Sequence, residues 1–166
     1  MDAIPTQAIP KFAADRMLLR VARWLRMLGA DTSFDESIDG AAMLRLARAE
    51  GRIMLTRDKR LKTAPEVLFL ESNDFRAQLR EVLTRHPFDI RQNAFSRCSR
   101  CNTPLIAVDR ELVRTRVPPF VYAANEKFSE CPRCAHLYWN GTHPDRISQE
   151  VAKIGLEGVS KARPAK

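Results

Sequence analysis

Two short cysteine pairs constrain the fold of this chain more than any other feature of its sequence. The pairs are Cys98-x-x-Cys101 and Cys131-x-x-Cys134, and 29 residues separate them. Four thiolates in two such knuckles are the ligand pattern of a zinc ribbon, which holds one tetrahedral Zn²⁺. The intervening segment LIAVDRELVRTRVPPFVY is rich in β-branched residues, which predicts the hairpin strands of the ribbon.

Two alternatives use the same cysteines. Two disulfides would suit an oxidising compartment, and a redox-active pair would open a helix after a strand. The beginning of the chain, MDAIPTQAIP, carries an acid and no long apolar stretch, so it does not look like a secretory signal. No run approaches the roughly 20 apolar residues of a membrane span. We therefore expect a cytoplasmic protein with no membrane partner, in which all four cysteines bind a structural zinc.

The rest of the chain alternates between strand and helix patterns. Strands are predicted at 9–15, 30–34, 52–56 and 66–72, and helices at 16–29, 40–51 and 73–86. This alternation predicts an α/β sandwich with a mostly parallel sheet. We expect the α/β domain to span 9–90, the zinc ribbon to span 95–150, and 1–8 and 158–166 to be mobile tails.

Four aspartates occupy equivalent places in this pattern. Asp15 follows the first predicted strand, Asp39 precedes the second helix, Asp58 ends the third strand, and Asp74 follows the fourth. In a parallel sheet the carboxyl ends of the strands share one rim, where ligands bind. The aspartates are therefore expected to converge there. The alternative for each is a helix N-cap, which is worth about 1 kcal/mol.

Basic residues cluster beside these aspartates. Arg16, Arg20 and Arg23 recur at helical spacing, whereas Arg57, Lys59 and Arg60 surround Asp58; the simpler interpretation of both groups is a solvated surface. The net charge of +8 favours a polyanionic partner. Carboxylates that hold Mg²⁺ or Mn²⁺, beside cations that hold phosphates, are what phosphodiester hydrolysis requires.

Several segments in order resemble the Mut-seven-C RNase domain family, over roughly residues 10–150: KFAADRML, ARWLRMLGADT, SIDGAAMLRLARAEGRIMLTRDKRL, QLREVL, FSRCSRCNTPL and CPRCAHLYWNGTH. This resemblance implies a PIN-like nuclease domain followed by a zinc ribbon, and metal-dependent cleavage of RNA. It also implies that Asp15, Asp39, Asp58 and Asp74 are the acidic positions of the site. Because PIN-like domains often pair, a homodimer is possible.

Two other functions compete with this hypothesis. A non-catalytic RNA- or ribosome-associated binding protein would use the aspartates only as caps. A phosphoryl-transfer or receiver-like domain would need an adjacent acidic pair after the first strand, which is absent from the sequence.

Aromatic residues follow the second cysteine pair. Tyr138, Trp139 and His143 could stack on RNA bases, although for Trp139 we favour a place over the small core of the ribbon.

Overall fold

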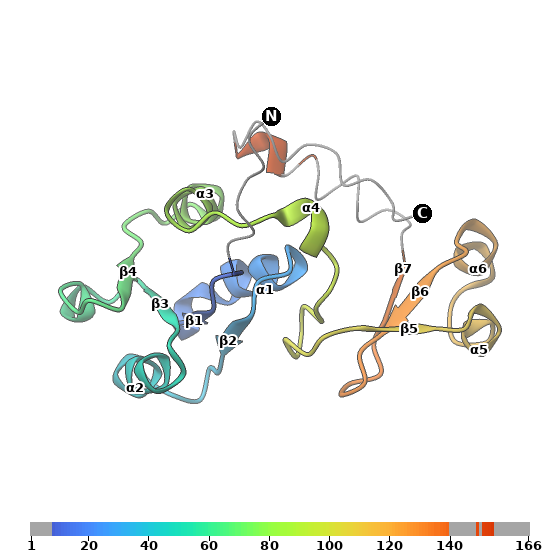
Figure 1. Cartoon of the computed structure of the whole chain (residues 1–166), viewed down its shortest axis with the longest axis horizontal. Coiled ribbons are helices and arrows are strands. Elements are labelled where there is room, and N and C mark those ends of the chain that lie inside the picture. The colour runs from blue at the N-terminus through green and yellow to red at the C-terminus, as the bar shows by residue number, and fades with distance from the viewer. Residues whose placement is uncertain (1–7, 140–148, 150, 155–166) are drawn as a thin grey trace.

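Four parallel strands form the centre of the first domain, as the alternation of strands and helices predicts. In the computed structural model, which describes residues 8–139, 149 and 151–154, their order is β2-β1-β3-β4 (Figure 1). All neighbouring pairs are parallel. The strands are β1 (Phe12–Ala14), β2 (Thr32–Phe34), β3 (Ile53–Thr56) and β4 (Val67–Phe69).

Helices cover both faces of this sheet. Phe12 and Ala14 pack with α1 and α3 on one face, whereas Ala13 packs with α2 on the other, because successive strand residues point to opposite faces (Figure 1). The helical elements of this domain are η1 (Arg16–Leu18), α1 (Leu19–Met27), α2 (Gly40–Glu50), η2 (Lys59–Leu61), α3 (Phe75–Arg85) and α4 (Ile90–Asn93).

The ribbon is a three-stranded antiparallel sheet in the order β5-β6-β7, with two short helices at its side (Figure 1). Its elements are β5 (Ile106–Val108), α5 (Arg110–Val113), α6 (Pro119–Ala124), β6 (Phe128–Glu130) and β7 (Leu137–Trp139). The fold is thus a mixed α/β domain followed by a zinc-ribbon-like module, as expected.

One prediction for the ribbon is wrong in part. The segment expected to form hairpin strands contains β5, but the residues after it form α5, a turn and α6. Asp109 caps α5 with its side chain, and Pro119 begins α6, where its missing N–H is not needed. Val113, Val117 and Val121 recur every four residues and bury together. Val113 ends α5, Val117 lies in the bend between the two helices and Val121 lies in α6. The helix-start signals at Asp109 and Pro119, together with this burial, therefore outweigh the strand preference of the valines.

After the ribbon the chain returns to the first domain. Val151 and Ile154 are buried in the core beside α1 and α3, and Arg80 Nε donates to the Ile154 carbonyl at 2.5 Å. The predicted tails lie outside the described residues, apart from Ala8, as does His143.

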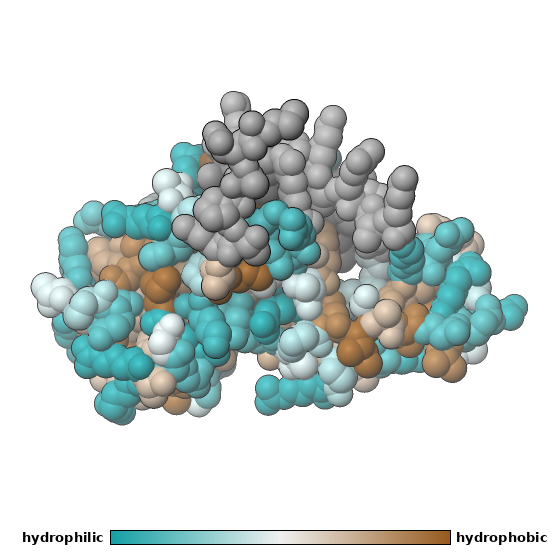
Figure 2. Space-filling model, viewed as in Figure 1, coloured by the Kyte–Doolittle hydropathy of each residue, from teal (hydrophilic) through white to brown (hydrophobic). Residues whose placement is uncertain are grey.

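The surface seen in the direction of Figure 1 is mostly hydrophilic, with apolar side chains showing in separate places over both domains (Figure 2). Among the described residues, no helix has both the length and the apolar character needed to cross a membrane.

Two glycines with positive φ provide a test of the packing between the end of α1 and α4. A Cβ at Gly29 (φ 98°) would lie 2.2 Å from the Asn93 carbonyl oxygen, whereas one at Gly51 (φ 61°) would meet nothing within 4 Å. We expect Gly29→Ala to lower the free energy of unfolding by roughly 3 kcal/mol or more, because steric overlap adds to the cost of the left-handed backbone. Gly51→Ala, the matched control, should cost only about 1 kcal/mol. Urea unfolding of both variants measures the difference, and equal losses would contradict this account.

Candidate functional site

The four cysteine sulfurs converge at one point of the ribbon. Their Sγ atoms all lie within 4.8 Å of one another, and those of Cys98 and Cys134 are 3.7 Å apart. A tetrahedron with Zn–S bonds of about 2.3 Å has edges of about 3.8 Å, so the spacing suits one Zn²⁺. All four cysteines are free, and a disulfide would require about 2.0 Å between sulfurs. The cluster therefore fits a bound metal ion.

The two knuckles share one backbone conformation. Asn102 N donates to the Cys98 carbonyl at 2.9 Å, and Ala135 N donates to the Cys131 carbonyl at 2.8 Å. Asn102 and Ala135, each directly after the second cysteine of its pair, are both left-handed. Both pairs lie in turns, and neither opens a helix as a thioredoxin-like pair would.

Tyr138 has a role that the sequence did not reveal. Its hydroxyl donates to Cys98 Sγ at 3.1 Å and accepts from Ser99 N at 3.1 Å. Burial raises the pKa of the Cys98 thiol, but the hydrogen bonds from Tyr138 and from backbone N–H groups outweigh burial and lower this pKa to about 7. Burial and the neighbouring sulfurs raise the pKa of Cys101 to about 12. The neighbouring sulfurs thus oppose a negative charge on Cys101, and a divalent cation would relieve this repulsion. Trp139 packs against the ribbon core, as predicted.

The first knuckle is fastened to the α/β domain. Arg26 on α1 is 4% exposed, and its Nη1 donates to the carbonyls of Ser99 (3.3 Å) and Arg100 (2.8 Å). Asn102 Nδ2 donates to Asp31 Oδ1 at 2.7 Å, and its Oδ1 accepts from Thr32 N at 3.0 Å. These bonds join residues about 70 positions apart, so they fix the knuckle on the corner between α1 and β2.

Asp15 is the most deeply placed of the four predicted acids. It directly follows β1, is 5% exposed, and makes no side-chain cap. Its Oδ2 accepts a hydrogen bond from Thr56 Oγ1 at 2.7 Å, and the same hydroxyl accepts from Asp58 N at 3.0 Å. Thr56 therefore links the ends of β1 and β3.

Asp15 and Asp58 face a common point. The position that a Cβ would occupy at Gly40 lies 3.8 Å from Oδ2 of each aspartate. The chain leaves β1 toward α1 on one face and leaves β3 toward η2 on the other, where Leu61 packs. The two carboxylates thus occupy the place where the connections of a parallel sheet diverge, which is where such sheets bind ligands.

Three predicted acids do act as helix caps. Asp39 Oδ1 accepts from Ala42 N (2.7 Å), Asp58 Oδ1 from Arg60 N (3.0 Å), and Asp74 Oδ2 from Ala77 N (2.8 Å). Over the part of the chain that the structure describes, the cysteines alone bring three or more ligand atoms within 4.8 Å of one another. The structure brings Asp15 and Asp58 to one point, whereas the aspartates do not form a closed cluster.

Arg60 is paired with Asp58 and also feels the charge of Asp39. Its Nη2 donates to Asp58 Oδ2 at 2.6 Å, and these hydrogen bonds hold the pKa of Asp58 below its ordinary value. The pKa of Arg60 is raised by Asp58 first and by the charge of Asp39 in addition. A single guanidinium therefore interacts with both carboxylates.

The other predicted cations point in different directions. The Arg20 guanidinium lies over the Phe75 ring at 4.1 Å, and Arg23 turns toward the first knuckle, where it lines a hollow. Arg16 and Lys59 are exposed. Arg57 Nε is buried and has no hydrogen-bond partner among the described residues. The helical stripe is thus not one continuous surface.

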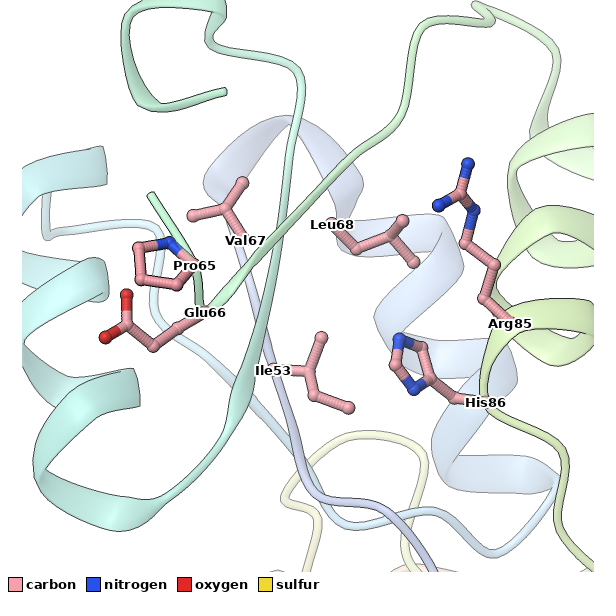
Figure 3. Close-up of a pocket in the computed structure, with 7 residues that line it drawn as sticks. All are labelled: Ile53, Pro65, Glu66, Val67, Leu68, Arg85 and His86. Carbon is pink, nitrogen blue, oxygen red and sulfur yellow. The ribbon is translucent and has the colours of Figure 1, made fainter. Parts of the chain in front are cut away.

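A separate hollow of about 370 Å³ lies at the opposite edge of the sheet. Figure 3 shows its lining: residues at the amino ends of β3 and β4, with Arg85 and His86 from the end of α3. Because the aspartates follow the carboxyl ends of the strands, this hollow is not part of the acidic site.

Comparison with known proteins identifies one family. The sequence model of the Mut7-C RNAse domain matches residues 10–151, which include both domains and every predicted site residue. This match confirms the resemblance noted in the sequence. No curated protein and no solved structure matches the chain.

The hydrogen bond from Tyr138 to Cys98 predicts that zinc affinity depends on Tyr138. We expect one Zn²⁺ per chain by native mass spectrometry and none after Cys131→Ser. Tyr138→Phe should weaken zinc affinity by about 10- to 100-fold, because its hydroxyl supports the Cys98 thiolate. Competition with a chelating dye measures the affinity. Tyr122→Phe is the matched control, since that hydroxyl bonds Glu111 instead; equal affinities for the two variants would show that Tyr138 has no such role.

The environment of Asp31 predicts that the free energy of unfolding falls in acid. Burial raises its pKa, but hydrogen bonds from Arg52 and Asn102 outweigh burial and leave this pKa below its ordinary value. The stabilisation is therefore complete above the unfolded pKa of about 3.9 and disappears as the pH falls through the lower folded value. In urea unfolding at pH 7 and pH 3, Asp31→Asn should reduce the difference in free energy between the two pH values. An unchanged difference would exclude Asp31 as a source of the acid dependence.

Proposed function

The chain belongs to the Mut7-C RNAse domain family, and we propose that it is a ribonuclease that hydrolyses RNA with the help of Mg²⁺ or Mn²⁺. The reaction would take place at the edge of the sheet where Asp15 and Asp58 follow the carboxyl ends of β1 and β3, which we call the acidic rim. One observation supports this proposal above the others. Asp15 is buried without capping a helix, and it faces the same point as Asp58 where the sheet connections diverge.

The burial of Asp15 favours a bound cation. A buried carboxylate is costly unless its charge is compensated. Thr56 donates one hydrogen bond to Asp15, but no ion pair of the described residues includes it. Carboxylate oxygens are the ligands that Mg²⁺ and Mn²⁺ prefer. The residues at this point therefore suit such an ion.

The four aspartates would have different roles in binding the ion. Asp15 and Asp58 would hold the ion, with Thr56 orienting the Asp15 carboxylate. Asp39 caps α2 with one carboxylate oxygen, and its other oxygen would be able to bind the ion. Asp74 follows the outer strand β4, so of the four aspartates it is the least suited to bind the ion. When bound, the ion would activate the attacking water and compensate the charge at the leaving oxygen.

The basic residues and the ribbon would serve RNA binding. Arg57, Lys59 and Arg60 follow β3 directly, and Arg16 follows Asp15, so all four lie beside the acidic rim. Four cysteine ligands complete the coordination of a zinc ion and leave no position for substrate. The zinc would thus fold the ribbon, which presents its own basic residues to RNA.

A non-catalytic RNA-binding protein is the second candidate. It is favoured by the finding that Asp39, Asp58 and Asp74 all cap helices. Asp15 distinguishes the two candidate functions, because its side chain caps no helix and a capping role therefore cannot account for its burial.

Cleavage of labelled single-stranded RNA with Mn²⁺ or Mg²⁺ tests the proposal. Asp15→Asn should lower the rate by about 100-fold or more, because the amide still accepts from Thr56 but brings no negative charge to the metal. Asp89→Asn is the matched control, since Asp89 caps α4 away from the rim. Zinc content and unfolding temperature should match the wild type in both variants.

Two outcomes would reject the enzyme. Zinc-loaded wild type that binds RNA without cleaving it would favour the binding protein. Equal rates for Asp15→Asn and wild type would remove Asp15 from the catalytic site.

A further inference from the structure

We propose that a hollow between α1 and the first knuckle is a binding site for one nucleotide of single-stranded RNA, next to the scissile bond. The inference rests on the proposed function for the identity of the polymer. The hollow has a volume of about 510 Å³ and is lined by Leu19, Arg23, Arg26, Phe34, Glu36, Ser99 and Arg100. No predicted site residue except Arg23 belongs to it.

The walls of this hollow are held in place. The knuckle wall carries Ser99 and Arg100, whose carbonyls both accept from the buried Arg26. Arg26 Nε also donates to the Thr32 carbonyl at 2.8 Å, at the beginning of β2. Because one guanidinium binds both sides, the hollow is built into the fold and does not depend on chance contacts between domains.

The lining suits a nucleotide. Arg23 and Arg100 are exposed at opposite walls, and arginine binds phosphate oxygens in a bidentate manner. Leu19 and Phe34 supply an apolar surface for a base or sugar, while Glu36 and Ser99 can hydrogen-bond its polar edges. A volume of this size falls within the range of about 300–1,000 Å³ typical of small-molecule sites.

The hollow lies on the same rim as the acidic site. Phe34 pairs with Ala14 in the register of β2 and β1, and Asp15 directly follows β1. Leu19 begins α1, four residues after Asp15. A single strand with its scissile phosphate at Asp15 would therefore extend across the end of β2 into the hollow. The ribbon thus contributes directly to substrate binding.

RNA affinity, measured without cleavage, tests this inference. We would measure the fluorescence anisotropy of a labelled ten-nucleotide RNA with the full, zinc-loaded chain, without Mg²⁺ or Mn²⁺, at several salt concentrations. The variant Arg23→Ala/Arg100→Ala should weaken binding by about tenfold or more and reduce the salt slope by about 1.4, because two phosphate contacts are lost. Arg45→Ala/Arg48→Ala removes the same charge from exposed positions on α2, outside the hollow. Its affinity should change by less than about twofold.

Each outcome decides the question. Equal losses in the two double variants would overturn the inference, since only net charge would then matter. If the first double variant unfolds earlier than wild type, Arg100→Ala alone provides the test, with half the slope change. Failure of the two proposals can be distinguished: RNA that binds through the hollow without being cut rejects the enzyme, whereas cleavage with no specific effect of Arg23 and Arg100 rejects the hollow.

Discussion

The buried guanidinium of Arg26 is the interaction on which the arrangement of the two domains depends. A cation at this depth needs hydrogen-bond acceptors, and it finds carbonyls at Thr32 on its own domain and at Ser99 and Arg100 on the ribbon. Burial lowers its pKa, while the charges of Cys98 and Cys101 oppose this effect. A zinc ion with four thiolates carries a net charge of −2, so the metal-loaded ribbon is electrostatically suited to the cation beneath it. Binding of zinc at the four cysteines would thereby strengthen the docking of the two domains.

The acidic rim depends on a different constraint, the order of the strands. Because β1 and β3 are neighbours although 38 residues lie between the end of β1 and the start of β3, Asp15 and Asp58 approach one point only in the folded sheet. Gly40 closes this point from the side of α2, and a side chain there would crowd Leu61 at 3.1 Å before it met the carboxylates. The caps at Asp39 and Asp58 then hold their carboxylates in fixed orientations. Capping and metal binding are therefore compatible roles for the same residues.

Local patterns in the sequence predicted the elements that depend on local interactions. The strands and helices of the first domain follow from apolar periodicity, and α2 ends at Gly51 because this residue adopts φ 61°. Interactions between distant residues were not predictable in this way. In the sequence, Arg26 is indistinguishable from the other arginines of its helix, and only the folded structure shows that it binds the carbonyls of Ser99 and Arg100. Thr56 likewise reads as an ordinary strand residue, and only the structure shows its hydrogen bond to Asp15. In α5 and α6, residue type suggested strands, whereas Asp109 and Pro119 were local signals for the start of helices.

The distribution of charge along the rim implies an order of events for the proposed ribonuclease. Asp15, Asp39 and Asp58 repel a phosphate until a divalent ion compensates them, and Arg60 offsets only part of this charge. Arg23 and Arg100 lie beyond β2, where they can hold a phosphate without the ion. RNA bound first in the hollow would place its neighbouring phosphate beside the carboxylates, and that phosphate would supply further oxygen ligands to the ion. The ion would therefore bind more tightly in the presence of RNA than in its absence, because the substrate completes a site that the aspartates leave open.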